Sequence, residues 1–253
     1  IITILLVALP ACKKVNASKG TKVDHIVSET GFTGIDLGIG ATLDFTESET
    51  TSIVVNTTDK VFKELDIYMS GSVLYFKVNN NTVIKNSDEI KIIISAPNVS
   101  SLECSGSGRI NATADTAVVH PNYSMDVSGS GSIVSNSIST DNQTVDVSGS
   151  GKIEISELTA TNCDASVSGS GSIVINAGTN TNSQVDISGS GSFQGFNFYA
   201  DTVNANVSGS GSAEVRAELN LNATISGSGN IRYKGTPLLS TTVTGSGSVI
   251  DAN

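Results

Sequence analysis

The sequence has no tryptophan, and aromatic residues of all kinds make up only 5% of its 253 residues. Hydrophobic residues amount to 38%, while 25 glycines occupy positions that larger side chains fill in most globular proteins. A wide globular core needs large side chains, so this composition favours a narrow core built in layers.

Basic residues are also scarce. The chain has 14 Lys and Arg against 24 Asp and Glu, which gives a formal net charge of −10 at pH 7. A surface that binds nucleic acid needs a basic patch to offset phosphate repulsion, so we expect no nucleic-acid partner. The acidic charge is spread thinly along the chain, as is usual for a solubilising surface.

The residues that most often carry catalysis or hold metals are few. His25 and His120 lie far apart, and neither has a Cys or a second His at metal-ligand spacing, so we expect no zinc site. No Gly-x-Ser-x-Gly nucleophile elbow occurs, and no glycine-rich phosphate loop opens a helix. The stretch His120-Pro121-Asn122 predicts an insertion at a corner, with His120 exposed in a loop. We predict neither a cofactor nor an enzymatic activity.

The first residues resemble a bacterial lipoprotein signal. Residues 1–9 are an apolar run too short to span a bilayer, and they lead into Leu9-Pro10-Ala11-Cys12. We predict that residues 1–12 are a truncated signal peptide, that Cys12 is lipidated, and that residues 13–20 are a polar tether. The protein would then be an exported outer-membrane lipoprotein, on the periplasmic face or at the cell surface, with the membrane as a partner through its lipid. An ordinary cleaved secretory signal followed by Cys is the alternative.

One motif dominates the second half of the chain. Ser-Gly-Ser-Gly, with Thr leading the last copy, begins at Ser105, Ser128, Ser148, Ser168, Ser188, Ser208, Ser226 and Thr244. Most copies are about 20 residues apart, with one longer interval at the start and two equal, shorter intervals at the end. Such regularity is typical of a stack of equivalent coils.

The residues around each motif alternate between apolar and polar with period 2, which is the pattern of a half-buried strand. The residue before the motif is Cys104, Val127, Val147, Val167, Ile187, Val207, Ile225 or Val243. Counted in twos from this residue, both glycines face inward and the serines face outward. The final shortening of the interval removes an even number of residues, so every side chain keeps its face. Cys104 and Cys163 should both face inward, about 14 Å apart, too far for a disulfide.

We therefore predict an all-β fold, a parallel β-helix (β-solenoid) with coils of about 20 residues. Residues 104–253 form its SGSG coils. Residues 21–103 have strand-like patterns without the motif and are predicted to be the first coils of the same solenoid. The alternative is an antiparallel β-hairpin meander or sandwich, in which SGSG would be a tight turn.

The sequence also resembles a known family. The segments Phe32-x-x-Ile35-x-Leu37 and Ile92-x-Ile94-x-Ala96-Pro97-Asn98-Val99-x-x-Leu102, together with the GSG repeats, look like the head-GIN-domain autotransporter adhesins. Most of these are uncharacterised lipoproteins of Gram-negative bacteria, and the resemblance covers residues 26–253. It implies a β-solenoid and a place in the cell envelope, but it brings no functional residues with it.

The outward polar residues of the coils are the candidate surface for a glycan or protein ligand. This candidate ladder consists of Asp126, Ser128, Asp146, Ser148, Ser168, Asp186, Ser188 and Ser208. The aspartates are replaced by Ser, Asn or Thr in other copies, so we expect no calcium site. We interpret the protein as an adhesin or a structural surface protein, with a homo-oligomer contact at the C-terminal end as a further hypothesis.

A carbohydrate-active β-helix enzyme acting on polysaccharide is the alternative function. Glu154 and Glu214 share an outward position but lie three coils apart, about 14 Å by coil stacking. That distance exceeds the roughly 5 to 9.5 Å of a glycosidase carboxylate pair.

Overall fold

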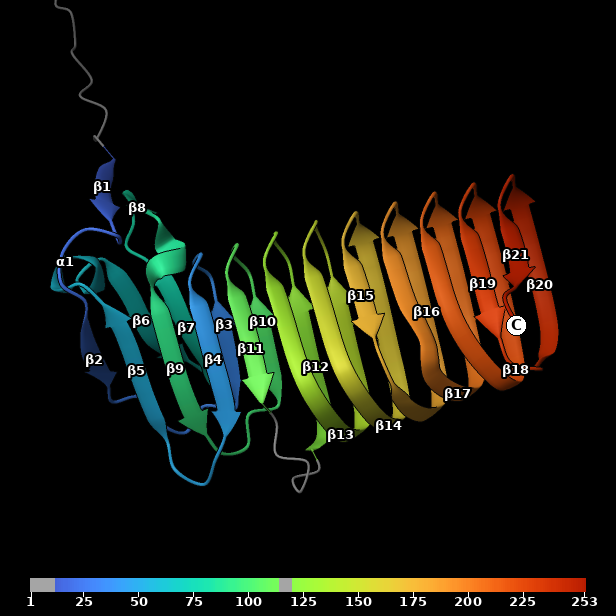
Figure 1. The fold of residues 1–253 in the computed structure, drawn as a ribbon, viewed down its shortest axis with the longest axis horizontal. Helices are drawn as coiled ribbons and strands as arrows, with labels where there is room; N and C mark the ends of the chain where they lie inside the picture. Colours follow the sequence, from blue (N-terminus) through green and yellow to red (C-terminus); the bar gives the residue numbers. More distant parts are fainter. Residues whose placement is uncertain (1–11, 114–119) are drawn as a thin grey trace, which may run out of the picture.

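The computed structural model describes residues 12–113 and 120–253, and it is nearly all β, with about seven turns spaced about 20 residues apart (Figure 1). Residues 1–11 of the predicted signal peptide lie outside the described residues. Within the described ranges, no helix has both the length and the apolar character to span a bilayer.

The SGSG coils form the regular part of the stack. Their strands are β10 (Ser101–Cys104), β11 (Arg109–Thr113), β12 (His120–Val127), β13 (Ser132–Val147), β14 (Lys152–Gly169), β15 (Ser172–Ile175), β16 (Gly178–Gly189), β17 (Ser192–Gly209), β18 (Ser212–Gly227), β19 (Asn230–Lys234), β20 (Leu238–Gly245) and β21 (Ser248–Asp251). Every pairing among these strands is parallel. The parallel β-solenoid is therefore confirmed, and the antiparallel meander is wrong for this part of the chain.

The register follows the motif spacing. In the long coils each strand residue pairs with its equivalent one motif interval later, as Val147 does with Val167. The short coils follow the same rule at their smaller interval, as in the pairing of Val207 with Ile225. The even change leaves Val207 and Ile225 both buried, as predicted.

The core is a narrow column of stacked apolar side chains. One side of the column holds Cys104, Val127, Val147, Val167, Ile187, Val207 and Ile225, and the other holds Ile110, Ile133, Ile153, Ile173, Phe193, Ala213 and Ile231. Each row buries one side chain per coil, and Phe193 is the one aromatic residue among those named, which explains how a chain with few aromatic residues fills its interior. Cys104 and Cys163 are both buried and unpaired, which confirms the prediction made for them.

The SGSG segments form the tight corners between strands, where consecutive coils come too close for side chains. A Cβ on Gly149 would lie 2.4 Å from the carbonyl oxygen of Gly129. A Cβ on Gly151 would lie 2.3 Å from Cγ1 of Val127 and 2.6 Å from the carbonyl oxygen of Gly131. The inward glycines are therefore required by the close approach of one coil to the next.

The N-terminal region begins the stack and also closes it. Its elements are β1 (Lys13–Asn16), β2 (Val23–Val27), β3 (Gly34–Leu37), β4 (Thr42–Glu47), β5 (Ser52–Thr57), α1 (Asp59–Phe62), β6 (Leu65–Ser70), β7 (Val73–Val78), β8 (Thr82–Lys85), the 3₁₀ helix η1 (Ser87–Glu89) and β9 (Lys91–Ala96). Strands β3 and β4 pair in parallel with β10 and β11, and β7 and β9 pair in parallel with β3 and β4. Strands β2, β5 and β6 make antiparallel pairs, which the sequence analysis did not predict.

The tether predicted for residues 13–20 is wrong over its first part. Residues 13–16 form β1, which pairs in parallel with β8. Val15 and Ala17 are buried, and Lys13 forms an ion pair with Glu64. The chain is therefore ordered against the fold immediately after Cys12, because alternate small apolar residues in this stretch find a partner strand far along the sequence.

His120 is not an exposed loop residue. It belongs to β12, its side chain is 10% exposed, and its Nε2 lies 2.8 Å from Oε1 of Glu47. The Thr140 hydroxyl donates a hydrogen bond to the carbonyl oxygen of His120, 2.7 Å away. The prediction failed because a buried carboxylate 73 positions earlier, which local sequence cannot reveal, supplies the histidine with a partner.

The corner contacts predict the effect of adding one methyl group. Gly151→Ala should lower the free energy of unfolding by about 1–3 kcal/mol, because the new Cβ overlaps Val127 and a backbone carbonyl of the preceding coil. The exposed neighbour Ser150→Ala is the control, and it should leave stability nearly unchanged. Urea unfolding followed by circular dichroism measures both, and equal stability of the two variants would contradict the close-approach explanation.

Candidate functional site

The predicted ladder residues lie in two neighbouring rows on the outer surface. The first row, which we call the acid–amide row, lies two residues before each motif. It runs through Asp36, Glu103, Asp126, Asp146, Ser166, Asp186, Asn206, Thr224 and Thr242 on successive coils. Neighbouring members lie about 4.8 Å apart along the stack, the spacing of paired strands.

The second row, the serine row, consists of the first serine of each motif. Its members Ser128, Ser148, Ser168, Ser188, Ser208 and Ser226 are all exposed. Ser168, Ser188, Ser208 and Ser226 pair in register on consecutive strands. The structure therefore arranges the eight predicted ladder residues as two parallel rows, each with one member per coil.

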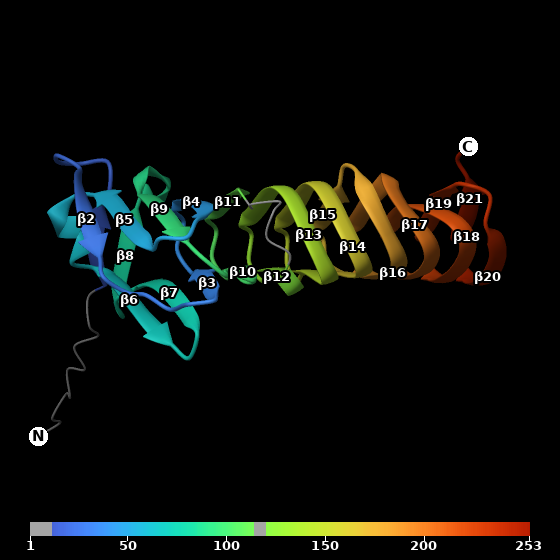
Figure 2. The same cartoon turned by 90° about the horizontal axis from the view of Figure 1, so that it is seen from below.

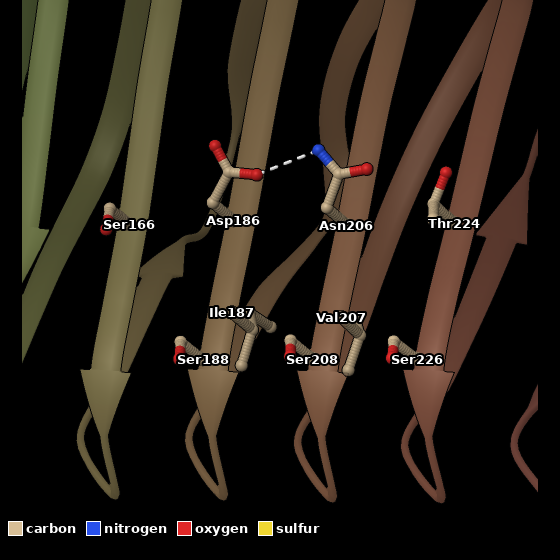
Figure 3. Close-up of a pocket in the computed structure, with 9 residues that line it drawn as sticks. All are labelled: Ser166, Asp186, Ile187, Ser188, Asn206, Val207, Ser208, Thr224 and Ser226. Carbon is tan, nitrogen blue, oxygen red and sulfur yellow. Dashed lines mark hydrogen bonds between the residues drawn. The ribbon is translucent and has the colours of Figure 1, made fainter. Parts of the chain in front are cut away.

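A shallow hollow of about 210 Å³ lies between the two rows (Figure 3). Its lining consists of Ser166, Asp186, Asn206 and Thr224 on one side, Ser188, Ser208 and Ser226 on the other, and Ile187 and Val207 between them. Nδ2 of Asn206 donates a hydrogen bond to Oδ1 of Asp186, 2.8 Å away, and Nε2 of Gln184 donates to the same carboxylate. The hollow thus presents hydroxyl, amide and carboxylate groups on either side of Ile187 and Val207.

The other end of the acid–amide row carries consecutive carboxylates. Asp36 is buried there, forms an ion pair with Lys77 and accepts a hydrogen bond from Ser105 Oγ at 2.6 Å. Burial raises the pKa of Glu103, and the negative charges of Asp36 and Asp126 raise it further. Lys77, which pairs with Asp36 on the first coil of the row, is therefore the main positive charge near these carboxylates.

The next two carboxylates on the row are affected in the same way. Burial raises the pKa of Asp126, and the charges of Asp146 and Asp36 add to the effect. Burial also raises the pKa of Asp146, partly offset by a hydrogen bond from Ser166. Like charges at strand spacing oppose ionisation, so this stretch costs folding free energy at neutral pH.

An asparagine ladder was missed by the sequence analysis. Asn142 Nδ2 donates to Oδ1 of Asn122 at 3.0 Å, Asn162 to Asn142 at 2.8 Å, and Asn182 to Asn162 at 3.1 Å. Asn142 and Asn162 each donate to the preceding coil and accept from the next, so the ladder ties four coils together. The signal was present in the sequence, since these four asparagines recur at the same interval as the long-coil motifs.

Neither a metal-binding cluster nor a Glu154–Glu214 pair occurs among the described residues. Among residues 12–113 and 120–253, no three His, Cys, Asp or Glu side chains converge as a metal site. Glu154 is bound to Lys152 and Asn176, and Glu214 is bound to Arg232. Their register places them three coils apart, so these two glutamates do not form an acid–base pair.

The outer rows of this solenoid repeat from coil to coil, so the protein presents an extended, repetitive surface. The chain belongs to the family described as "Putative auto-transporter adhesin, head GIN domain", whose model matches residues 31–237. The resemblance noted in the sequence is therefore confirmed. No curated protein matches the chain significantly.

Solved structures share this fold. A structure described as a putative lipid binding protein from Parabacteroides distasonis is 23% identical, with a TM-score of 0.87, covering 95% of this chain and 100% of that one. A putative adhesin from Parabacteroides merdae is 22% identical, with a TM-score of 0.87 and the same coverage. A second P. distasonis structure, a putative adhesin, is 20% identical with a TM-score of 0.83 and covers 94% of this chain and 99% of that one. At these identities the likeness concerns the fold alone.

The raised pKa of Asp126 predicts a pH-dependent stability. Because its pKa is higher in the folded chain than in the unfolded chain, its ionised form opposes folding. The stability that protonated Asp126 contributes is fully present below about pH 3.9, the ordinary aspartate pKa, and it is lost as the pH rises through the folded-state pKa of Asp126. Asp126→Asn should therefore raise the urea midpoint at pH 7 and should change it little near pH 3.5.

The matched control is Asp186→Asn, at the same position of another coil. Asp186 accepts hydrogen bonds from Asn206 and Gln184, and an amide in its place gives up one acceptor oxygen. This variant should gain no stability at pH 7. A gain of equal size in both variants would show that general charge reduction, and not the local row, is responsible.

Proposed function

We propose that the protein is a non-catalytic adhesin of the cell envelope, exported and held at the outer membrane by a lipid on Cys12. The observation that carries the proposal is the pair of unbroken polar rows on a solenoid whose coils repeat in register. Such a surface offers the same groups at a fixed spacing, which suits a repetitive ligand such as a glycan or an extended protein. Membership of the adhesin family supports it.

The position of Cys12 supports the proposed anchor. Cys12 is exposed, and β1 begins at the next residue and is paired with β8. In Figures 1 and 2 this region lies at the opposite end of the solenoid from β20 and β21. An acyl group on Cys12 would therefore hold the N-terminal end at the membrane, and the coils would project outward by roughly the eight strand spacings of the acid–amide row, about 38 Å.

A polysaccharide-degrading enzyme is the alternative, and the site geometry favours binding over catalysis. The hollow between the rows is lined by a single carboxylate, Asp186, and the carboxylates Glu103, Asp126 and Asp146 lie side by side along the acid–amide row. Glu154 and Glu214 are held in ion pairs with Lys152 and Arg232. General acid–base catalysis needs two carboxylates converging on one bond. We therefore propose that bound sugar would be held and not cleaved.

Association of copies at the C-terminal end is a further part of the proposal. Strand β20 exposes Leu238, Leu239 and Val243, with 79%, 44% and 44% of their surface accessible. Exposed apolar residues on β20 support pairing with a second copy through that strand. Size-exclusion chromatography with light scattering measures the state, and a monomer at all concentrations would contradict this part.

The anchor is tested by a single substitution in the full chain behind a complete lipoprotein signal. Cys12→Ser should abolish incorporation of radiolabelled palmitate and should release the protein from the outer-membrane fraction, because the acylated thiol is lost. Cys163→Ser, which changes a buried thiol, is the control and should keep both properties. Unchanged labelling of Cys12→Ser would contradict lipidation at this residue.

The adhesive role is tested with residues 13–253 on a glycan array. We expect saturable binding to one glycan class, because the repeating rows favour a repeating ligand. The fold of the sample is verified by circular dichroism. A folded protein that binds no glycan and no cell surface would contradict the adhesin proposal.

A further inference from the structure

The change from long to short coils creates a step on the outer surface. In the pairing of β17 with β18, Gln194 lies opposite Glu214 and Tyr199 lies opposite Arg216. Residues 195–198 of the last long coil thus face a single residue, Val215, of the first short coil. The extra residues form an irregularity in the strand pairing, in which Phe198 is buried and Phe196 is half-buried.

Cations from the short coils surround the aromatic side chains of this step. The guanidinium carbon of Arg216 lies 4.0 Å from the ring centroid of Tyr199. Arg232 and Lys234 lie over Phe196, with the guanidinium carbon 5.4 Å and Nζ 4.9 Å from the ring centroid. We call these five residues the aromatic–cationic step, and each contact has the geometry of a cation–π interaction.

The step concentrates positive charge on an acidic protein. Its three cations are three of the five basic residues that follow Lys91, in a chain with a net charge of −10. Two carboxylates lie beside them, since Arg216 Nε donates to Glu218 Oε1 at 2.7 Å and Arg232 Nη1 donates to Glu214 Oε1 at 2.6 Å. Glu218 and Glu214 are paired with two of the three cations, and Asp251 lies opposite Tyr233 on the neighbouring strand, so the step is distinguished by the gathering of its cations and not by a net excess of positive charge.

The step also retains unused hydrogen-bond donors. Each guanidinium has five N–H donors in a fixed fork, and the two ion pairs engage one nitrogen of each. Within the described chain, Lys234 Nζ contacts the Phe196 ring and has no carboxylate partner. The side chain of Arg232 is 48% exposed and Tyr199 is 42% exposed, so these groups are accessible to a ligand.

We propose that the aromatic–cationic step binds an acidic saccharide. The exposed part of the Tyr199 ring can contact the polarised C–H groups of a sugar ring, Phe196 holds Arg232 and Lys234 beside it, and the free N–H groups suit a carboxylate or sulfate on that sugar. A neutral sugar would leave the cations unused, and an acidic peptide would leave the rings without a flat partner. The inference rests on the proposed adhesive function in taking a glycan as the ligand.

The step is separate from the hollow between the two rows. The hollow lies on the strand segments that precede the SGSG corner, and the step lies on the segments that follow it. A ligand at the step would therefore touch the solenoid on the other side of the corner, near its C-terminal end. Variants of the step leave both rows intact.

The test uses purified residues 13–253 and isothermal titration with three probes: tetragalacturonate, a neutral galactose tetrasaccharide and tetraglutamate. We expect binding of the uronate and little binding of the other two. The double variant Arg232→Gln/Lys234→Gln should weaken uronate binding about tenfold or more, as expected for the loss of charge-assisted contacts. Phe196→Ser should weaken it while keeping every charge.

The matched control is Arg109→Gln/Lys152→Gln, which removes the same two charges at a place where no aromatic contact to these cations occurs among the described residues. It should change uronate binding less than about twofold, since a distant charge acts only through a screened field. Circular dichroism and thermal unfolding check that all variants fold. If Phe196→Ser does not fold, the two charge variants still decide the question.

The outcomes separate this inference from the adhesin proposal. Equal losses in the two double variants would show general electrostatic attraction and overturn the step as a site. Equal binding of tetraglutamate would overturn its assignment to a saccharide. Array binding of a neutral glycan that survives the step variants would keep the adhesin proposal and overturn the step. A folded protein that binds cell surfaces but no glycan would overturn the step alone, and one that binds neither would overturn both.

Discussion

The structure depends on the contact between consecutive glycine corners. The amide of Ser150 donates to the carbonyl of Gly129 at 3.2 Å, and the amide of Ser170 donates to the carbonyl of Gly149 at 2.9 Å. These hydrogen bonds form only where the next coil brings a Cα without a side chain against that carbonyl. Because each corner fixes the rise to the next, the strands on both sides stay in register. The straight core column and the surface rows are both consequences of this constraint.

The arrangement of charge along the axis divides the solenoid into unlike parts. The acidic half of the acid–amide row begins at Asp36 beside Lys77 and continues through Glu103, Asp126 and Asp146 with little compensation. Farther along, amides and hydroxyls replace the carboxylates except at Asp186, and the cations gather at the step. The backbone repeats nearly unchanged while the chemistry displayed on it changes from coil to coil. In a solenoid the fold and the surface can therefore vary almost independently.

The structural features that recur in every coil could be predicted from the sequence, and the features that occur only once could not. The coil length, the inward glycines and the burial of Cys104 and Cys163 all follow from the spacing and alternation of a recurring motif. The ion pair of His120 with Glu47 and the pairing of β1 with β8 join distant segments that no local pattern connects. The asparagines of the ladder recur in the sequence at the coil interval, but they lie outside the SGSG motif on which the prediction was based. The shortening of the last coils was also visible, but spacing alone cannot say where the extra residues bulge.

The parallel stacking has a mechanical consequence. Hydrogen bonds between coils run along the solenoid axis, so a pull on the last coil along that axis opens them in sequence from the end, and not all at once in shear. Each coil of about 20 residues that peels away lengthens the chain by roughly 70 Å. Under load the protein would therefore extend in discrete increments and dissipate work at each one. The solenoid would thus unfold one coil at a time, while the remaining coils stay folded.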